Sequence, residues 1–197
     1  MQKTFSEVET SLSRLLQSTL EQTLSGCKPG STWSSSRADA LSEIPFEHCI
    51  VLTISSFRFK IMCLLHMNLD EANHQFVAAA MNIKRGDLED EAYSDYLLEM
   101  SNSLCGTLKR HMQSSCPPLG MSTPNFLQRT CLSIEHALAP RYNVHARCRD
   151  NQGNSTLFAA SLLVFSTQPE DFQLKNYKEY VKDSNDEAEA SGELELF

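Results

Sequence analysis

The sequence predicts an α+β domain in which helices pack on an antiparallel sheet, and three patterns predict this class. Apolar residues recur at helical spacing through residues 3–24, which predicts an amphipathic N-terminal helix. Two runs at 49–56 and 57–67, rich in Ile, Val, Leu and Phe, predict a pair of strands. Two further runs between residues 142 and 166 flank DNQGN and predict a closing β-hairpin. Helix, strand pair, helices and hairpin in this order are typical of α+β folds.

Two helices are expected between the strand pair and the hairpin. Asn68 or Asp70 can cap a first helix that runs to about Ile83, where KRG interrupts the pattern. The second helix is expected to begin at Asp87 and to end before the prolines at 117 and 118. Its expected core stripe consists of Tyr93, Leu97, Met100, Leu104 and Leu108. The stretch GMSTPNFLQRTCLSIEHA then has the alternation and turn residues of extended chain.

These elements divide the chain into four parts. The N-terminal helix, residues 1–24, is expected to pack on the main domain at 47–167. Residues 25–46 form a polar linker. A connection that long is unusual inside a domain, so it is expected either to contribute a strand or to wrap around the surface. Residues 168–197 form an acidic tail that is expected to be partly disordered, since few of its side chains can form a core.

Charge and composition exclude several classes of function. The net charge is −8 and the pI about 5.2, so the surface repels phosphate backbones and nucleic acid is not expected as a partner. Every apolar run is far shorter than the ~20 residues that span a bilayer, and the first residues lack the apolar core of a signal peptide. A cytoplasmic protein that binds no membrane is therefore expected. The seven scattered cysteines favour free thiols, and neither they nor the histidines are spaced for a metal site.

One face of the second helix is acidic and ends in an unusual group of residues. Acidic residues recur at 87, 91, 95 and 99, and Asn102 lies one turn beyond Glu99, so the two side chains are neighbours. Ser103 and Gly106 add little bulk beside them. A glycine inside a helix costs about 1 kcal/mol relative to alanine and often marks the close approach of another backbone. The pattern therefore indicates either a docking surface or, as the alternative, an ordinary solvated helix face.

This stretch resembles the motif of the CheC/CheX/FliY family of chemotaxis phosphatases. The motif here consists of Asp95, Glu99 and Asn102 in the spacing Asp-x-x-x-Glu-x-x-Asn, with a small residue at Gly106. Pro124 matches the family's later proline, one residue short of the usual spacing. The order of the elements over residues 3–166 is also similar to that of the family. A single motif in the chain resembles CheX rather than the two-site CheC.

The resemblance implies a hydrolase that removes the aspartyl phosphate of a CheY-like response regulator, in chemotaxis or two-component signalling. It implies that Asn102 orients the attacking water and that Glu99 reaches a lysine of the partner. It also implies the residues that contact the partner: Asp95, Ser103, Gly106 and Pro124. Mg²⁺ would belong to the partner, and this chain would need no cofactor and no metal.

The resemblance further implies a homodimer, formed through exposed edges of the sheet. One alternative function is a non-catalytic interaction module or scaffold that binds a phosphorylated response regulator without hydrolysing it. Another is an acidic chaperone or adaptor that uses its amphipathic helices.

Overall fold

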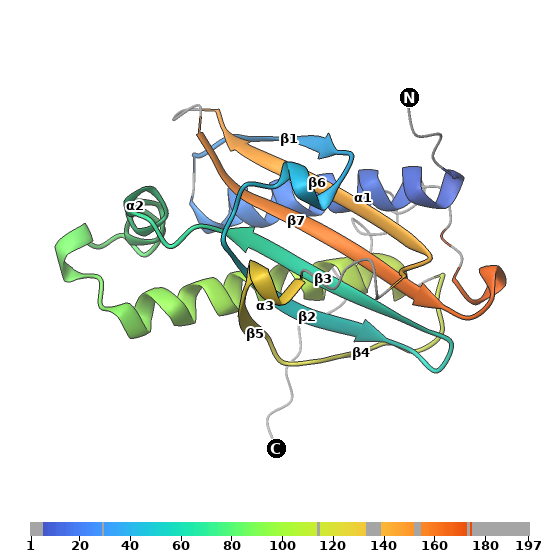
Figure 1. Ribbon diagram of the computed structural model, residues 1–197. Coiled ribbons are helices and arrows are strands. Elements are labelled where there is room, and N and C mark those ends of the chain that lie inside the picture. The colour runs from blue at the N-terminus through green and yellow to red at the C-terminus, as the bar shows by residue number, and fades with distance from the viewer. Residues whose placement is uncertain are drawn as a thin grey trace, which may run out of the picture.

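The computed structural model describes residues 6–28, 30–113, 115–132, 139–151, 155–172 and 174. It shows an α+β fold with a seven-stranded sheet (Figure 1). The helices are α1 (Glu7–Cys27), α2 (Glu71–Ala80) and α3 (Asp90–Gln113). The strands are β1 (Trp33–Ala38), β2 (His48–Ser55), β3 (Phe59–Met67), β4 (Gly120–Met121), β5 (Asn125–Gln128), β6 (Tyr142–Asp150) and β7 (Ser155–Ser166). Short 3₁₀ turns lie at Leu41–Glu43 (η1), Arg85–Asp87 (η2), Arg129–Leu132 (η3) and Pro169–Asp171 (η4).

The sheet is antiparallel in every described pairing, and its strand order is β1-β6-β7-β3-β2, with β4 and β5 both paired to β2. The predicted strand pair forms β2 and β3, which pair from His48↔Met67 to Ser55↔Lys60. The predicted closing hairpin forms β6 and β7, the latter also pairing along β3. These two hairpins make the centre of the sheet, as the apolar runs predict.

α1 and α3 cover one face of the sheet and form the main core with it (Figure 1). α1 begins at a capping box, in which Ser6 accepts a hydrogen bond from the backbone of Glu9 and the Glu9 carboxylate accepts one from the backbone of Ser6. Its buried stripe is leucine-rich: Leu12, Leu15, Leu16, Leu20 and Leu24. The two helices contact each other, so together they form a continuous layer against the strands.

The polar segment after α1 contributes a strand, β1, to the sheet. This is one of the two arrangements that the sequence predicts for a connection of that length. Trp33 anchors the strand in the core against Phe76 and Phe158, at ring-centroid distances of 5.6 and 6.2 Å. The Glu21 carboxylate of α1 accepts hydrogen bonds from the backbone and hydroxyl of Ser35, both at 2.6 Å. β1 is an edge strand, which explains how a serine-rich sequence can take this place.

The second face of the sheet carries a smaller core that the connection between β1 and β2 covers. Leu41, Ile44 and Phe46 from this connection pack on Leu64 and Leu163 of the sheet. Arg129 holds the connection in place, because its guanidinium donates hydrogen bonds to the carbonyl oxygens of Leu41 and Phe46, at 2.8 and 3.4 Å.

A polar cluster lies buried within this second face. The Ser161 hydroxyl lies 2.9 Å from His66 Nε2 and 2.8 Å from His145 Nδ1, and all three side chains are almost fully buried. Burial, with smaller contributions from His145 and Arg129, lowers the pKa of His66 to about 3. His66 is therefore neutral at pH 7, and protonating it in the folded state is costly.

Two helix boundaries differ from those that the sequence predicts. Asp70 caps α2, but the helix ends at Ala80 rather than near Ile83, because Asn82 adopts a left-handed conformation with φ of 56°. The long helix begins at Asp90 rather than Asp87, since Asp87 belongs to η2 and the extended backbone of Leu88 separates the two.

The residues predicted to form the acidic tail lie mostly outside the described part of the structure. Of 168–197, the structure describes 168–172, which include η4, and Leu174. The expected disorder after residue 174 is therefore untested. Among the described residues, no helix combines the length and apolar character that a membrane crossing requires.

Candidate functional site

α3 presents one face to the core and the opposite face outward, as its sequence predicts. The five stripe residues named for its core face are all buried, and Ser101, Cys105 and Met112 extend that buried surface. Cys105 contacts Cys63 of β3, and this contact together with burial raises the Cys63 pKa well above its usual value. Both thiols are packed inside the core, consistent with Cys105 being a small filler rather than a nucleophile.

The outward face of α3 brings most of the predicted site residues together. Asp95, Glu99 and Ser103 are exposed, and Asn102 and Gly106 are half-buried on the same side of the helix. Within the described part of the chain, the side chains of Glu99 and Asn102 have no hydrogen-bond or ion-pair partner. A carboxylate and an amide one turn apart are thus both available to a molecule that approaches this face.

A groove of about 550 Å³ runs between this face and the C-terminal end of α1. The groove is lined from α3 by Tyr96, Glu99, Met100, Ser103 and Thr107, and from α1 by Gln22, Thr23, Gly26 and Cys27. The Tyr96 hydroxyl of α3 donates a hydrogen bond to the Cys27 carbonyl oxygen of α1, at 3.5 Å, which links the two helices beside the groove. Burial raises the pKa of Tyr96 well above its usual value, which keeps this hydroxyl protonated.

Gly106 is not explained by packing inside the chain. A Cβ atom built at this position meets no heavy atom within 4 Å, and the same is true of Gly26 across the groove. The close approach that the sequence predicts at Gly106 is therefore not made by any described part of this chain. The space above the glycine is open in the described part of the chain, although a glycine weakens the helix relative to alanine.

Pro124 lies apart from the residues that line the groove. It is half-buried in the short connection between β4 and β5, beside β2. The connection is fixed to the sheet, since Ser122 donates its backbone N–H to the Thr53 carbonyl oxygen and its hydroxyl accepts the Thr53 N–H, both at 2.9 Å.

The α1 side of the groove was not predicted from the sequence. Gln22, Thr23 and Gly26 lie on the polar side of an amphipathic helix, where the sequence shows only an ordinary hydrophilic face. The one sequence signal on α1 is that the small residues Thr23 and Gly26 lie three residues apart, as Ser103 and Gly106 do on α3. This signal is weak, because small residues on a polar helix face are common.

The site is built from hydrogen-bonding side chains rather than from a metal-binding cluster. No three His, Cys, Asp or Glu residues within the described ranges are grouped so that they could hold a metal ion. The available chemistry on α3 is a carboxylate, an amide and a hydroxyl, which can bind a cation, orient water and accept or donate hydrogen bonds.

Comparisons with known proteins identify the fold. The sequence matches no protein-family model and no curated protein. The structure is similar to that of the chemotaxis protein CheX from Vibrio vulnificus, with a TM-score of 0.58 and 11% identity over 77% of this chain and 97% of that one. CheX from Desulfovibrio desulfuricans gives a TM-score of 0.56 at 10% identity, with coverage of 78% and 99%.

A third similar structure is the complex of CheX with CheY, BeF₃ and Mg²⁺ from Borrelia burgdorferi. Its TM-score is 0.53 at 12% identity, with 82% of this chain and 99% of that chain covered. These likenesses extend over nearly the whole of each solved chain, so they concern the complete domain and not a shared substructure. This chain therefore has the fold of the CheX and CheC-like chemotaxis proteins.

Proposed function

We propose that this protein is a CheX-like phosphatase that hydrolyses the aspartyl phosphate of a CheY-like receiver domain, in chemotaxis or two-component signalling. The observation that carries the proposal is the free pair of Glu99 and Asn102 on the outward face of α3, beside an open groove and a glycine that no internal contact requires. The fold is that of proteins one of which was solved bound to CheY, BeF₃ and Mg²⁺. BeF₃ has the shape and charge of a phosphoryl group, so a phosphorylated receiver fits the same arrangement.

The reaction requires a water molecule in line with the phosphorus atom. The water oxygen forms a bond to phosphorus while the bond from phosphorus to the aspartate oxygen breaks, giving inorganic phosphate and a free carboxylate. An amide side chain can both donate to and accept from a water molecule, so Asn102 would fix its orientation without changing its own protonation. The Mg²⁺ that neutralises the phosphoryl charge would be held by the receiver.

Glu99 would hold the two proteins in register. A carboxylate one turn from Asn102 can pair with a lysine beside the receiver's phosphoryl group. Ser103 and Gly106 would leave room for the receiver's loops to approach the helix, and Asp95 and Pro124 would contact the receiver at the edge of the interface. In this arrangement catalysis comes mainly from positioning.

The experiment that tests this proposal measures phosphate loss from a phosphorylated receiver domain with and without the protein. Glu99→Ala should remove most of the stimulation and weaken binding, since a charge pair with the partner is lost. Asp95→Ala should have a milder effect, because its side chain lies a turn further from the centre of the site. Equal activity of the wild type and the Glu99 variant would contradict the role of Glu99. Tight binding without any acceleration by the wild type would favour the binding-module alternative.

Gly106→Ala should separate a docking role of this glycine from a packing role. Because a Cβ atom at this position meets nothing within 4 Å, alanine should raise the free energy of unfolding by up to about 1 kcal/mol. The same methyl group should lower phosphatase activity, since it occupies space left for the receiver. Urea denaturation and the phosphate-loss assay would measure the two effects. A destabilised variant, or one that is more stable and fully active, would count against the docking role.

We also propose a homodimer, with sheet edges as the contact. β1 is an edge strand, and an exposed sheet edge is a surface to which a second copy can add. Light scattering at micromolar concentration should then give twice the monomer mass of 22.2 kDa. A species of the monomer mass alone would contradict the dimer but would leave the proposed phosphatase activity standing.

A further inference from the structure

The turn between β2 and β3 exposes an aromatic side chain that the proposed phosphatase site does not use. Phe57 is 80% exposed, whereas no other large apolar side chain in the described ranges exceeds 40%. The Arg58 guanidinium lies 5.1 Å from the centre of the Phe57 ring, within the range of a cation–π contact. An exposed aromatic ring beside a cation offers a ligand an apolar contact and a positive charge at the same place.

Hydrogen bonds hold the backbone of this turn in place. The Ser56 hydroxyl accepts hydrogen bonds from the backbone N–H groups of Arg58 and Phe59, at 3.1 and 3.2 Å. The backbone of Ser56 also donates to the Phe59 carbonyl oxygen at 2.9 Å, which closes the turn. Because these bonds fix the loop, Phe57 and Arg58 are presented to a ligand with little further loss of backbone entropy.

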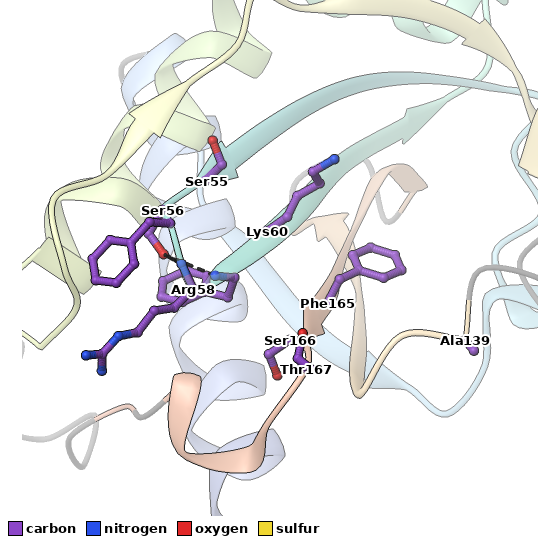
Figure 2. Close-up of a pocket in the computed structure, with 10 residues that line it drawn as sticks. Ser55, Ser56, Arg58, Lys60, Ala139, Phe165, Ser166 and Thr167 are labelled. Carbon is purple, nitrogen blue, oxygen red and sulfur yellow. Dashed lines mark hydrogen bonds between the residues drawn. The ribbon is translucent and has the colours of Figure 1, made fainter.

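A pocket of about 450 Å³ lies beside this turn, and its charge is unusual for the molecule. Figure 2 shows Lys60 and Phe165 extending from neighbouring strands, with Arg58 at the turn. The described lining holds these two cations and no acidic residue, in a chain of net charge −8. The Arg58 side chain points to one side of the turn, and Lys60 and Phe165 point to the other (Figure 2). Cations on both sides of a partly apolar turn suit an acidic peptide that carries apolar side chains.

The sequence contains such a peptide, and the last described residues before it lie beside Phe59, which lines the pocket. Phe172 is buried, and its ring lies 4.9 Å from that of Phe59 at the base of the turn. Leu174, the last described residue, also packs on the main core. Beyond it, residues 183–197 contain six acidic residues, no lysine or arginine, and the apolar side chains Leu194, Leu196 and Phe197.

We propose that the acidic segment 183–197 docks on the surface formed by Phe57, Arg58, Lys60 and Phe165. Ten residues lie between Phe172 and Asp183, and an extended chain over these eleven steps spans up to about 40 Å. Phe57 is two residues from Phe59, so the acidic segment easily reaches it. A tether of this length gives an effective concentration of about a millimolar, so even a weak interaction populates the docked state.

The test uses the full chain, with ¹⁵N labelling and NMR signals of the amides of residues 183–197 as the readout. These signals should shift in the charge-reversed variant R58E/K60E and, in the wild type, when NaCl is raised from about 20 mM to about 0.5 M, because salt screens the contact. Losing two exposed charge pairs should lower the docked-to-free ratio by about fivefold. Phe57→Ala should move chiefly the signals of the apolar residues 194–197.

The matched control is R14E/K84E, which changes the net charge equally at two exposed sites outside the pocket. It should leave the tail signals nearly at their wild-type positions. Equal tail signals in the wild type and R58E/K60E would overturn the proposal, as would equal shifts in R58E/K60E and in the control. Shifts that grow with protein concentration would overturn it in favour of docking between copies. Phosphatase assays do not enter this test, so its outcome is independent of the proposed activity.

Discussion

Replacing Asn102 with alanine is expected to slow receiver dephosphorylation by a factor of about 10² or more, while the protein stays folded. The loss corresponds to roughly 3 kcal/mol of transition-state stabilisation, the usual cost of removing one preorganised polar group. Asn102 is suited to this role because its amide has no partner within the described part of the chain and lies one turn from Glu99. Binding of the receiver should change little, because the charge pair of Glu99 remains.

A matched control is available on the same helix. Gln113 also carries an amide and is exposed, but it lies at the end of α3, away from the groove. Gln113→Ala should retain the wild-type rate. Both substitutions should change the free energy of unfolding by no more than about 0.5 kcal/mol, since neither side chain has a hydrogen-bond partner within the described part of the chain. A fall in the rate of the Gln113 variant equal to that of the Asn102 variant would show that the assay reports helix stability rather than chemistry.

The second large effect is expected on stability in mild acid, through His66. Its folded-state pKa of about 3 lies below the value near 6.5 of an unfolded chain, so the unfolded state binds the proton that the folded state excludes. The contribution of neutral His66 to the free energy of unfolding is therefore fully present above about pH 6.5, and it is lost as the pH falls towards the folded-state pKa. The loss is about 1.4 kcal/mol per pH unit, or about 2 kcal/mol between pH 6.5 and pH 5.

Urea denaturation at pH 7.5 and at pH 5 would measure this effect, with His66→Gln as the test variant. Glutamine can hydrogen-bond to Ser161 but does not titrate, so the variant should lose about 2 kcal/mol less than the wild type over this range. Only the difference between the two pH values is compared, so a general destabilisation by the substitution does not affect the result. Identical pH dependence of the wild type and His66→Gln would contradict the expected cost of protonating His66.

The sequence predicted the parts of the fold in which one pattern decides the structure. The apolar runs of β2, β3, β6 and β7 and the core stripes of α1 and α3 identify the central sheet and the helices that cover it, because their periodicities are regular. The outward face of α3 was predicted in the same way, since Glu99 and Asn102 must lie on one side of any helix that buries Leu97 and Leu104.

The remaining features depend on contacts between distant parts of the chain. β1 is a polar strand whose place is set by Trp33 in the core, by Glu21 and by pairing with β6, and its own sequence does not have a strand pattern. The buried cluster of His66, Ser161 and His145 comes from three different strands, so no local spacing reveals it. The α1 side of the groove is polar helix surface until α3 lies beside it. The predicted start of α3, at Asp87, was wrong by three residues, because the acidic pattern extends back into η2 whereas the helix begins only at Asp90.

The most direct test of the central claim is the rate of phosphate loss from a phosphorylated CheY-like receiver domain, measured alone, with the wild-type protein and with the Asn102→Ala variant. The proposed phosphatase predicts that the wild type accelerates the loss and that the folded variant retains about 1% or less of that acceleration. A wild-type protein that binds the phosphorylated receiver without accelerating phosphate loss, or a folded variant as active as the wild type, would contradict the assignment of catalysis to this face of α3.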